Sequence, residues 1–326
     1  MLQSGEVDYM SQIDKQKMTN RGHHSRKIRR RVRNSVLGFV AVLAVGFVGF
    51  TAYGYHTVST TTKAMYKPSG ATKERNASAV IKDKKPVSIL MVGTDSNKIN
   101  RTGSLMLVTL NPKTNKTVEM SLPDNLKVNL PGYKQYSPAT VNQAYSYGGT
   151  KETVKTVQSY LKVPVDYYMA VNMNGLDKTV NKVGGVNVTS PQTFTNNGKT
   201  FNAGQNYHLN GANTGKFLSL RESDTKGYNQ QQARQRAVLS ALLKKSTSYK
   251  TVLNKSYLNT LGDEMQTDLT EKQMTQLALH YRHADQNVKS ETVNAKSQKL
   301  GGKNFEVAPT SERTRAVNAV RQNLGF

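Results

Sequence analysis

One acid and one arginine stand on a polar loop between two apolar runs. Asp95 directly follows the run "VSILMVGT", and Arg101 comes shortly before the run "SLMLVTLNP". Loops that follow buried strands commonly carry functional groups. Arginine holds phosphate through two parallel hydrogen bonds, and a carboxylate beside bound phosphates is the usual protein ligand of Mg²⁺. The pair therefore indicates either a phosphate and metal site or an ordinary solvated turn.

Two more arginines lie downstream, in "FLSLRESDTKGYNQQQARQ". They are Arg221 and Arg234, the second on the first turns of a predicted long helix. Arginine suits phosphate better than lysine because its planar fork matches two phosphate oxygens. Each could also be a surface charge, Arg221 paired with Glu222 or Asp224. Taken together, Asp95 and the three arginines favour a pyrophosphate site.

Other kinds of chemistry find little support. The chain has no Cys, no G-x-S-x-G elbow, no P-loop and no H-E-x-x-H motif. His280 and His283, near Asp285, have the spacing of metal ligands on a helix, but such a pair is more often the solvated end of a helix. We therefore do not predict thiol, serine or zinc-hydrolase chemistry.

An uncharged segment near the N-terminus indicates where the chain resides. Residues 36–53, "VLGFVAVLAVGFVGFTAY", carry no charge and follow the basic stretch "RKIRRRVRN". Such a segment is about long enough to cross the ~30 Å hydrocarbon core as a helix, and basic residues stay on the cytoplasmic side. We predict a cytoplasmic tail at 1–34, a membrane-spanning helix at 35–55 and an extracellular remainder. A cleaved signal peptide is the alternative, although no clear A-x-A site follows.

The charge of the extracellular part bears on its partners. The chain has 46 Lys and Arg against 21 Asp and Glu, a net charge of +25. Residues 1–34 hold nine Lys or Arg and three Asp or Glu, a net +6, which leaves +19 for the rest. An excess of this size points to polyanionic partners. Outside the cell these are anionic lipid or wall polymer, so we predict no nucleic-acid partner.

The periodicity predicts one α/β domain from 86 to 326, a central mixed sheet flanked by helices, after an extracellular stalk at 56–85. A buried strand at 87–94 leads into a meander with strands at 104–112 and 117–123. Tyr145, Tyr147, Tyr167 and Tyr168 are expected to pack in the core. Further strands are expected at 165–173, 186–190 and near 304–309, and helices at 150–162, 174–185, 229–247, 249–262, 270–284 and 311–325.

The order of several motifs resembles the LytR–CpsA–Psr (LCP) family. Family members show G-S-D-S-R…R-S-D-T, then S-I-P-R-D, N-x-A-Y-x-x-G-G, V-P-V/I-D-Y-Y with a following V-G-G-V, and finally L-N-G…R-x-R…R-x-x-R-Q. The corresponding stretches here are "GTDSNKINRTGSLML", "SLPDN", "VNQAYSYGG", "VPVDYYMAVNMNGLDKTVNKVGGVNVTSP" and "LNGANTGKFLSLRESDTKGYNQQQARQ". The likeness runs from about Ser88 to Leu243.

The resemblance implies a fold, an activity and a set of site residues. It implies helices that enclose an apolar lipid pocket, and Mg²⁺-dependent transfer of an anionic glycopolymer such as teichoic acid from a polyprenyl-pyrophosphate carrier to peptidoglycan. Asp95 would hold the metal, and it would form the catalytic set with the three arginines. The pyrophosphate would be bound by Arg101, Arg221, Arg234 and Gln235.

Several motif positions depart from the family pattern. Asn97 stands where the first arginine is expected, and Gly103 replaces the acid of R-S-D. Asp124 occupies the arginine position of P-R-D, and a negative charge there would disfavour a diphosphate. Asn125, Ser219 and Gln231 also replace charged residues.

These departures leave three functional interpretations. The first is an active transferase, and the second is a weak or inactive accessory or regulatory protein that binds polyprenyl phosphate or wall polymer. The third is a structural protein that holds anionic polymer by charge alone, with binding that weakens steeply as salt is added.

Overall fold

The computed structural model describes residues 65–94, 102–172, 175–219, 225–246 and 265–326. The chain divides into two compact units, 1–56 and 57–326, and every described residue belongs to the second. Asp95, Asn97, Arg101 and Arg221, together with the helix expected at 249–262 and the span expected at 35–55, lie outside the described residues. No helix among the described residues is long and apolar enough to cross a membrane.

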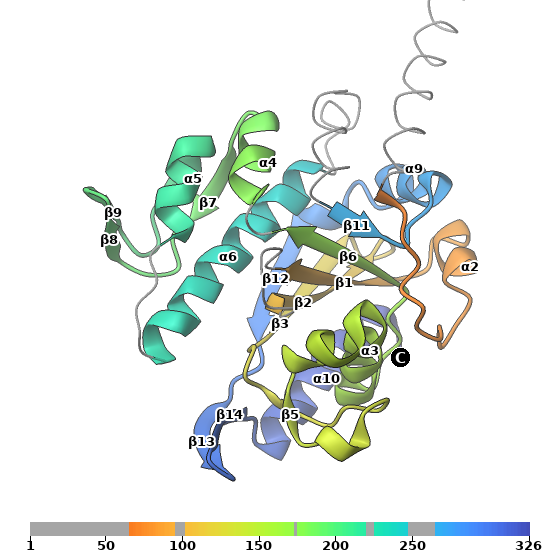
Figure 1. Cartoon of the computed structure of the whole chain (residues 1–326). Helices are drawn as coiled ribbons and strands as arrows, with labels where there is room; N and C mark the ends of the chain where they lie inside the picture. The colour runs from red at the N-terminus through yellow and green to blue at the C-terminus, as the bar shows by residue number, and fades with distance from the viewer. Residues whose placement is uncertain (1–64, 95–101, 173–174, 220–224, 247–264) are drawn as a thin grey trace, which may run out of the picture. The chain divides into compact units, whose positions relative to one another are not determined.

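A six-stranded mixed sheet forms the centre of the fold (Figure 1). Its order is β11-β6-β1-β2-β3-β12, with β1 parallel to β6, β3 parallel to β12, and the remaining neighbours antiparallel. The predicted meander is the β1-β2-β3 unit. The strands are β1 (Val87–Thr94), β2 (Thr102–Asn111), β3 (Lys116–Leu122), β6 (Tyr167–Asn172), β11 (Met265–Thr267) and β12 (Asn287–Thr292).

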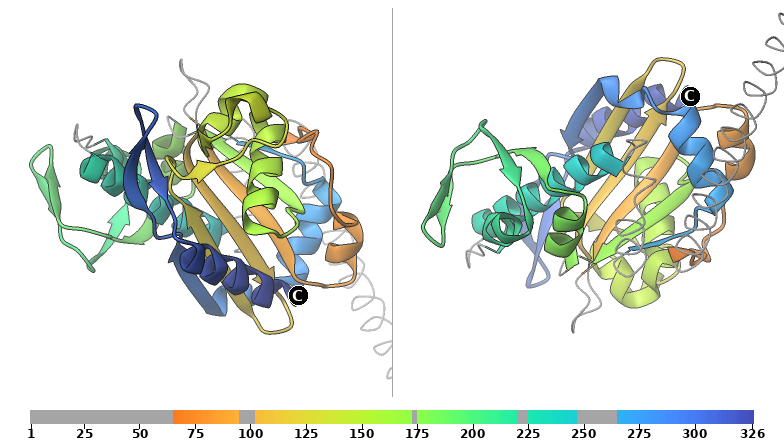
Figure 2. Two further views of the ribbon diagram at one scale, coloured as in Figure 1. Left: turned by 90° about the horizontal axis from the view of Figure 1, so that it is seen from below. Right: turned by 90° about the horizontal axis from the view of Figure 1, so that it is seen from above.

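Helices cover both faces of this sheet, as the two views of Figure 2 show. The helices α3 (Gln143–Leu161) and α10 (Thr310–Leu324) pack on one face, against buried residues such as Leu90, Leu107 and Met120. The other face is flanked by α2 (Ala77–Lys82), α6 (Thr225–Ser246) and α9 (Glu271–His280). Since strand side chains alternate between faces, Tyr168 packs with Leu90 on the face covered by α3 and α10, and Tyr167 packs with residues of α2 and α9 on the other face.

A second apolar core lies under smaller elements. It gathers Val171 of β6, Val238 of α6 and three phenylalanines, which are Phe194, Phe201 and Phe217. The elements around it are α4 (Leu176–Lys182), β7 (Val186–Thr189), β8 (Phe194–Asn196), β9 (Lys199–Phe201), β10 (Asn206–Leu209) and α5 (Gly211–Leu218). The remaining elements are β4 (Lys127–Val128), η1 (Lys134–Tyr136), β5 (Ala139–Thr140), η3 (Ala284–Gln286), β13 (Lys296–Leu300) and β14 (Lys303–Val307).

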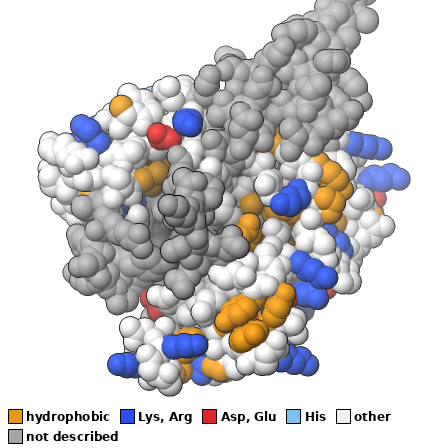
Figure 3. Space-filling view, viewed as in Figure 1, with side chains coloured by type: hydrophobic (Ala, Val, Ile, Leu, Met, Phe, Trp, Pro, Cys, Tyr) orange, Lys and Arg blue, Asp and Glu red, His pale blue; other side chains and the backbone are white. Residues whose placement is uncertain are grey.

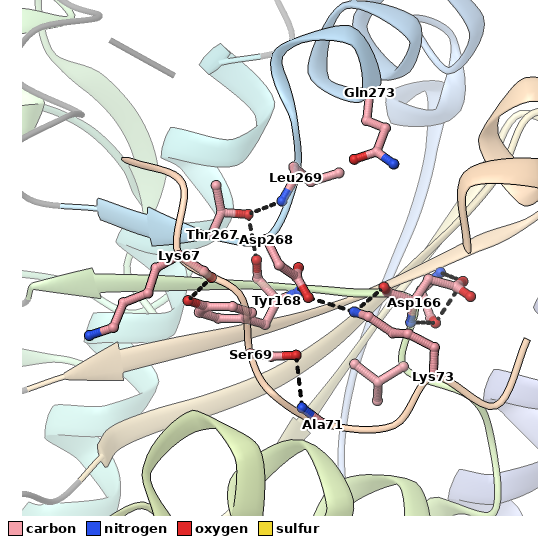
Figure 4. Close-up of polar contacts among 12 residues, drawn as sticks. Lys67, Ser69, Ala71, Lys73, Asp166, Tyr168, Thr267, Asp268, Leu269 and Gln273 are labelled. Carbon is pink, nitrogen blue, oxygen red and sulfur yellow. Dashed lines mark hydrogen bonds and ion pairs between the residues drawn. The ribbon is translucent and has the colours of Figure 1, made fainter. Parts of the chain in front are cut away.

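The segment expected as the end of a stalk lies against the domain. Met65 is buried, Tyr66 bridges to Thr267, and Ile81 of α2 is fully buried in a cluster with residues of β1 and α9. Figure 4 shows the polar contacts of this segment: the Lys73 side chain donates to Asp268 at 2.5 Å, and the backbone carbonyl of Lys67 accepts from the Tyr168 hydroxyl at 2.7 Å. Residues 65–85 are therefore packed as part of the globular unit.

Candidate functional site

The predicted loop begins where two parallel strands end. β1 ends at Thr94 and the parallel β6 ends at its partner, Asn172. β2 begins at Thr102, and a β-bulge interrupts its pairing with β1 between Gly93 and Thr94. In α/β sheets, ligands bind outside the carboxyl ends of parallel strands. Asp95 and Arg101 therefore belong to the segment that joins two strands at a favourable edge, although their own positions lie outside the described residues.

Helix α6 brings the last predicted motif to this edge. A Cβ built on Gly103 would lie 3.7 Å from Oε1 of Gln235. Gly103 stands at the family's acid position on β2, and Gln235 is the glutamine of the predicted R-Q pair. Two motifs more than 100 residues apart are thus neighbours, and the contact is loose enough to leave room for a larger side chain at position 103.

Arg234 is held against an aromatic ring. Its guanidinium carbon lies 4.5 Å from the centre of the Phe194 ring, and the side chain is only 1% exposed. Stacking on an aromatic face stabilises a desolvated guanidinium by about 2 kcal/mol. Phe194 was not among the predicted site residues, because no local sequence signal places a strand residue under a helix residue 40 positions later.

The acid at position 124 has a cationic neighbour. Asp124 follows β3 and is 1% exposed. Burial lowers the pKa of Arg236 below its ordinary value, while the negative charges of Asp124 and Glu306 act in the opposite direction. The charge of Asp124 is therefore partly balanced from α6. Sequence reasoning considered Asp124 alone and missed Arg236, which lies only two residues beyond Arg234.

Residues on either side of the segment that carries Arg221 also make hydrogen bonds. Ser219, the exposed residue after α5, accepts a hydrogen bond from Asn196 at 3.0 Å. Gln231 on α6 donates to the carbonyl of Leu218 at 3.4 Å. Ser219 and Gln231, which stand where the family pattern has arginines, thus make structural contacts at the end of α5 and on α6.

Metal ligands do not gather within the described ranges. No group of three His, Cys, Asp or Glu side chains there could hold a metal ion. His280 lies with its ring 3.4 Å from the carbonyl of Ile81, in a helix-packing position. Gly103 offers no side-chain oxygen. Asp95, which the resemblance assigns to the metal, lies outside the described residues, and carboxylate and phosphate oxygens together are a common donor set for Mg²⁺.

An apolar layer continues from the site on the same face of the sheet. Met91, Met106 and Val108 are buried together, with Met169 packed against them. Met91 and Met106 are cross-strand partners, two positions from the Gly93 and Ser104 pair at the edge. The enclosed lipid pocket stays a prediction, and this layer is the part of the fold that would form its floor.

Comparison with known proteins connects this geometry to a family. The model of the LytR_cpsA_psr family matches residues 52–321. A relative from Bacillus mycoides (strain KBAB4), named polyisoprenyl-teichoic acid–peptidoglycan teichoic acid transferase TagU, is 33% identical over 298 residues, which cover 89% of this chain and 96% of that protein.

Solved structures agree with the sequence match. TagV of B. subtilis superposes with a TM-score of 0.62 at 27% identity, covering 74% of this chain and 98% of that one. A structure of TagT bound to LIIa-WTA gives a TM-score of 0.62 at 25% identity, covering 78% of this chain and 94% of that one. Sequence, fold and motif order agree, and this chain belongs to the LytR–CpsA–Psr family.

Proposed function

We propose that this protein is a cell-envelope transferase that moves an anionic glycopolymer from a polyprenyl-pyrophosphate carrier to peptidoglycan. Support comes from the relatives, which are named as teichoic acid transferases acting on peptidoglycan, and from TagT, whose structure contains LIIa-WTA. The chain spans nearly the full length of these relatives.

One observation carries the proposal to this chain's own residues. Gln235 of α6 lies beside Gly103 at the start of β2, and the stacked Arg234 is its neighbour in sequence. The loop with Asp95 and Arg101 begins and ends at the same edge of the sheet. This arrangement suits a ligand that carries several negative charges, since cationic and amide donors come from two separate elements.

The proposed chemistry is phosphoryl transfer. An acceptor hydroxyl of peptidoglycan forms a bond to the phosphorus that carries the polymer and loses its proton. The bond from that phosphorus to the bridging oxygen breaks, and polyprenyl phosphate leaves. Arg101, Arg221 and Arg234 would bind the phosphate oxygens and neutralise their charge, which is the main source of catalysis in such reactions. Gln235 would orient the ligand, and Mg²⁺ held through Asp95 would supply further neutralisation.

The location follows from the same proposal. The segment 35–55 would anchor the protein, and residues 1–34 would remain in the cytoplasm. The described domain would then face the outer surface, where peptidoglycan is assembled, with the carrier's lipid tail over the Met91 and Met106 layer. The strong positive charge of the chain is consistent with an anionic membrane surface and an anionic polymer.

Binding of a short polyprenyl diphosphate tests this proposal. The full chain in detergent would be titrated calorimetrically with farnesyl diphosphate, with and without Mg²⁺. The double variant Arg101→Ala, Arg221→Ala is expected to weaken binding by more than about 100-fold, because two charge-assisted hydrogen-bonding groups are removed. The matched control removes two exposed charges elsewhere, through Lys134→Ala and Arg282→Ala.

The outcomes separate the functional interpretations. Binding that needs Mg²⁺ and is lost only in the site variant supports the transferase. Lipid binding that ignores Mg²⁺ and survives the site variant would support the binding protein instead. Absence of lipid binding, with salt-sensitive retention on wall polymer, would leave only the interpretation as a structural polymer-holding protein.

A further inference from the structure

A small hairpin outside the main sheet makes contact with Arg234. β8 and β9 pair antiparallel, with Phe194 opposite Phe201 and Asn196 opposite Lys199. The turn consists of Asn197 and Gly198, with φ values of 47° and 73°. Two successive residues with positive φ form the tight turn preferred in two-residue hairpins, and Asn-Gly is its favoured sequence. The hairpin therefore has a well-defined shape of its own.

Two other aromatic rings fix the ring beneath Arg234. Phe194 stacks on Phe201 of β9 with centroids 4.9 Å apart and planes at 19°. It also meets Phe217 of α5 at 5.5 Å in an edge-on arrangement with an angle of 64°. Phe201 and Phe217 are fully buried. The orientation of the Phe194 ring, over which the Arg234 guanidinium lies, is thus set by contacts with two elements.

Hydrogen bonds attach the hairpin to both helices around the site. The side chain of Gln192 donates to the carbonyl of Gln230 on α6 at 3.1 Å. The side chain of Asn196 donates to the carbonyl of Lys216 at 2.7 Å, and it also reaches Ser219. The hairpin and the residue that leads into it are therefore attached to the end of α5 and to an early turn of α6. The position of the hairpin therefore determines where the Phe194 ring meets Arg234.

Stacking has a consequence for what a guanidinium can bind. The aromatic ring covers one face of the planar group, while the N–H donors lie around its rim, in the plane. A stacked arginine keeps its hydrogen-bonding edge but loses rotational freedom. Less conformational entropy is then lost when an anion binds, which strengthens binding without any added contact.

From these contacts we propose that Phe194 is a positioning residue, through which the β8–β9 hairpin holds the Arg234 guanidinium in the orientation that binds the diphosphate. This inference rests on the proposed function, because it assigns a support to one of its anion-binding groups. It adds a role for a hairpin that none of the predicted motifs includes. Phe194 acts through Arg234 and does not contact the ligand.

The test compares variants at position 194 in the full chain in detergent. Phe194→Leu keeps an apolar side chain without an aromatic face, and Phe194→Tyr keeps the face. We expect Phe194→Leu to weaken farnesyl diphosphate binding by about 3- to 30-fold, the range for loss of a cation–π contact. Phe194→Tyr should bind as tightly as the unaltered protein. In Arg234→Lys, which lacks the planar group, Phe194→Leu should cause no further loss.

Two controls exclude a general effect on folding. Val188→Ala removes methyl groups from the same core, where Val188 is 2% exposed, and should lower the melting temperature without changing binding. Thr195→Ala alters the solvent side of the hairpin, where Thr195 and Thr200 share an exposed hydrogen bond. It should change neither quantity.

The results distinguish the two proposals. If the unaltered protein does not bind farnesyl diphosphate, the proposed function fails. If it binds and Phe194→Leu binds equally well, or if Phe194→Leu and Arg234→Lys have independent effects, the positioning role is wrong while the proposed function stands. Loss in Phe194→Leu, recovery in Phe194→Tyr and no effect of Val188→Ala support the positioning role.

Discussion

At the scale of single residues, the motif positions keep Asp95 and three arginines but lack two acids of the family pattern, at Gly103 and Asn125. Gly103 replaces the family's acid and lies beside Gln235, with its would-be Cβ in ordinary van der Waals contact at 3.7 Å. Asp124, whose charge alone would repel a diphosphate, is buried within the influence of Arg236. Affinity for a metal ion is therefore the property that a single substitution at this edge would test best.

Gly103→Asp should increase the affinity for Mg²⁺. The position is half-buried and has room for a side chain, so the variant should fold. A second carboxylate near Asp95 should lower the Mg²⁺ concentration for half-maximal diphosphate binding by about tenfold or more. Titration of Mg²⁺ at fixed farnesyl diphosphate measures this. Gly103→Ala, which adds volume without charge, is the control, and an equal response of both variants would contradict the prediction.

Glu312 should make the fold sensitive to acid. Hydrogen bonds from Arg315 lower the pKa of Glu312 from 4.5 to about 2, with a smaller contribution from the amide of Asn294. A depressed carboxyl pKa stabilises the fold above the unfolded value, and this stability is lost as pH falls from about 4.5 towards 2.

Glu312→Gln should therefore lower the melting temperature at pH 7 and reduce its dependence on pH between these values. Thermal unfolding at a series of pH values measures both effects. Asp83→Asn, at an exposed pair with Lys85, is the control and should behave as the unaltered protein does. An unchanged pH profile in Glu312→Gln would show that this carboxyl has an ordinary pKa.

At the scale of elements, the segment before β1 is attached through a buried carboxylate. Asp166 has a fully buried side chain that accepts from Arg75 at 2.7 Å and from the amide of Ser88 at 2.8 Å. These contacts join the chain before α2 to the start of β1 and β6, the two strands that lead to the site. The segment therefore contributes to the same framework that carries the loop with Asp95.

Asp166→Asn should lower the free energy of unfolding by about 3 kcal/mol. The substitution removes the charge that balances Arg75, and breaking a buried ion pair from one side is costly. Urea denaturation measures the change, with Asp83→Asn again as the surface control. A loss below about 1 kcal/mol, equal to that of the control, would contradict the structural role of this segment.

Several elements could be predicted from the sequence because their signals are local. The apolar run at 87–94 coincides with β1, and the Thr270 and Gln273 capping box is present at the start of α9. Helix α3 begins at Gln143 rather than near 150, because two helical pieces join across a kink at Gly148 and Gly149. The stack of Phe194 on Arg234 has no local signal, since it depends on the packing of a hairpin against α6.

At the scale of the whole molecule, the distribution of charge bears on how a polyanion can bind. Lys and Arg side chains are spread over the face seen in Figure 3 and do not form one dense cluster. A dispersed positive surface attracts polyanions weakly and without strict orientation, and added salt screens it. Under the proposed function, specific recognition of a carrier would come from the site at the edge of β1 and β2 and not from this surface.

Reconstituted transfer tests the central claim most directly. The full chain in detergent would be mixed with a glycopolymer on a polyprenyl-diphosphate carrier, purified peptidoglycan and Mg²⁺, and the phosphate that becomes covalently attached to peptidoglycan would be measured. We predict attachment that requires Mg²⁺ and falls by more than about 100-fold in the double variant Arg101→Ala, Arg221→Ala. No attachment by a folded protein that still binds the carrier, or attachment that is unchanged in this variant, would contradict the account.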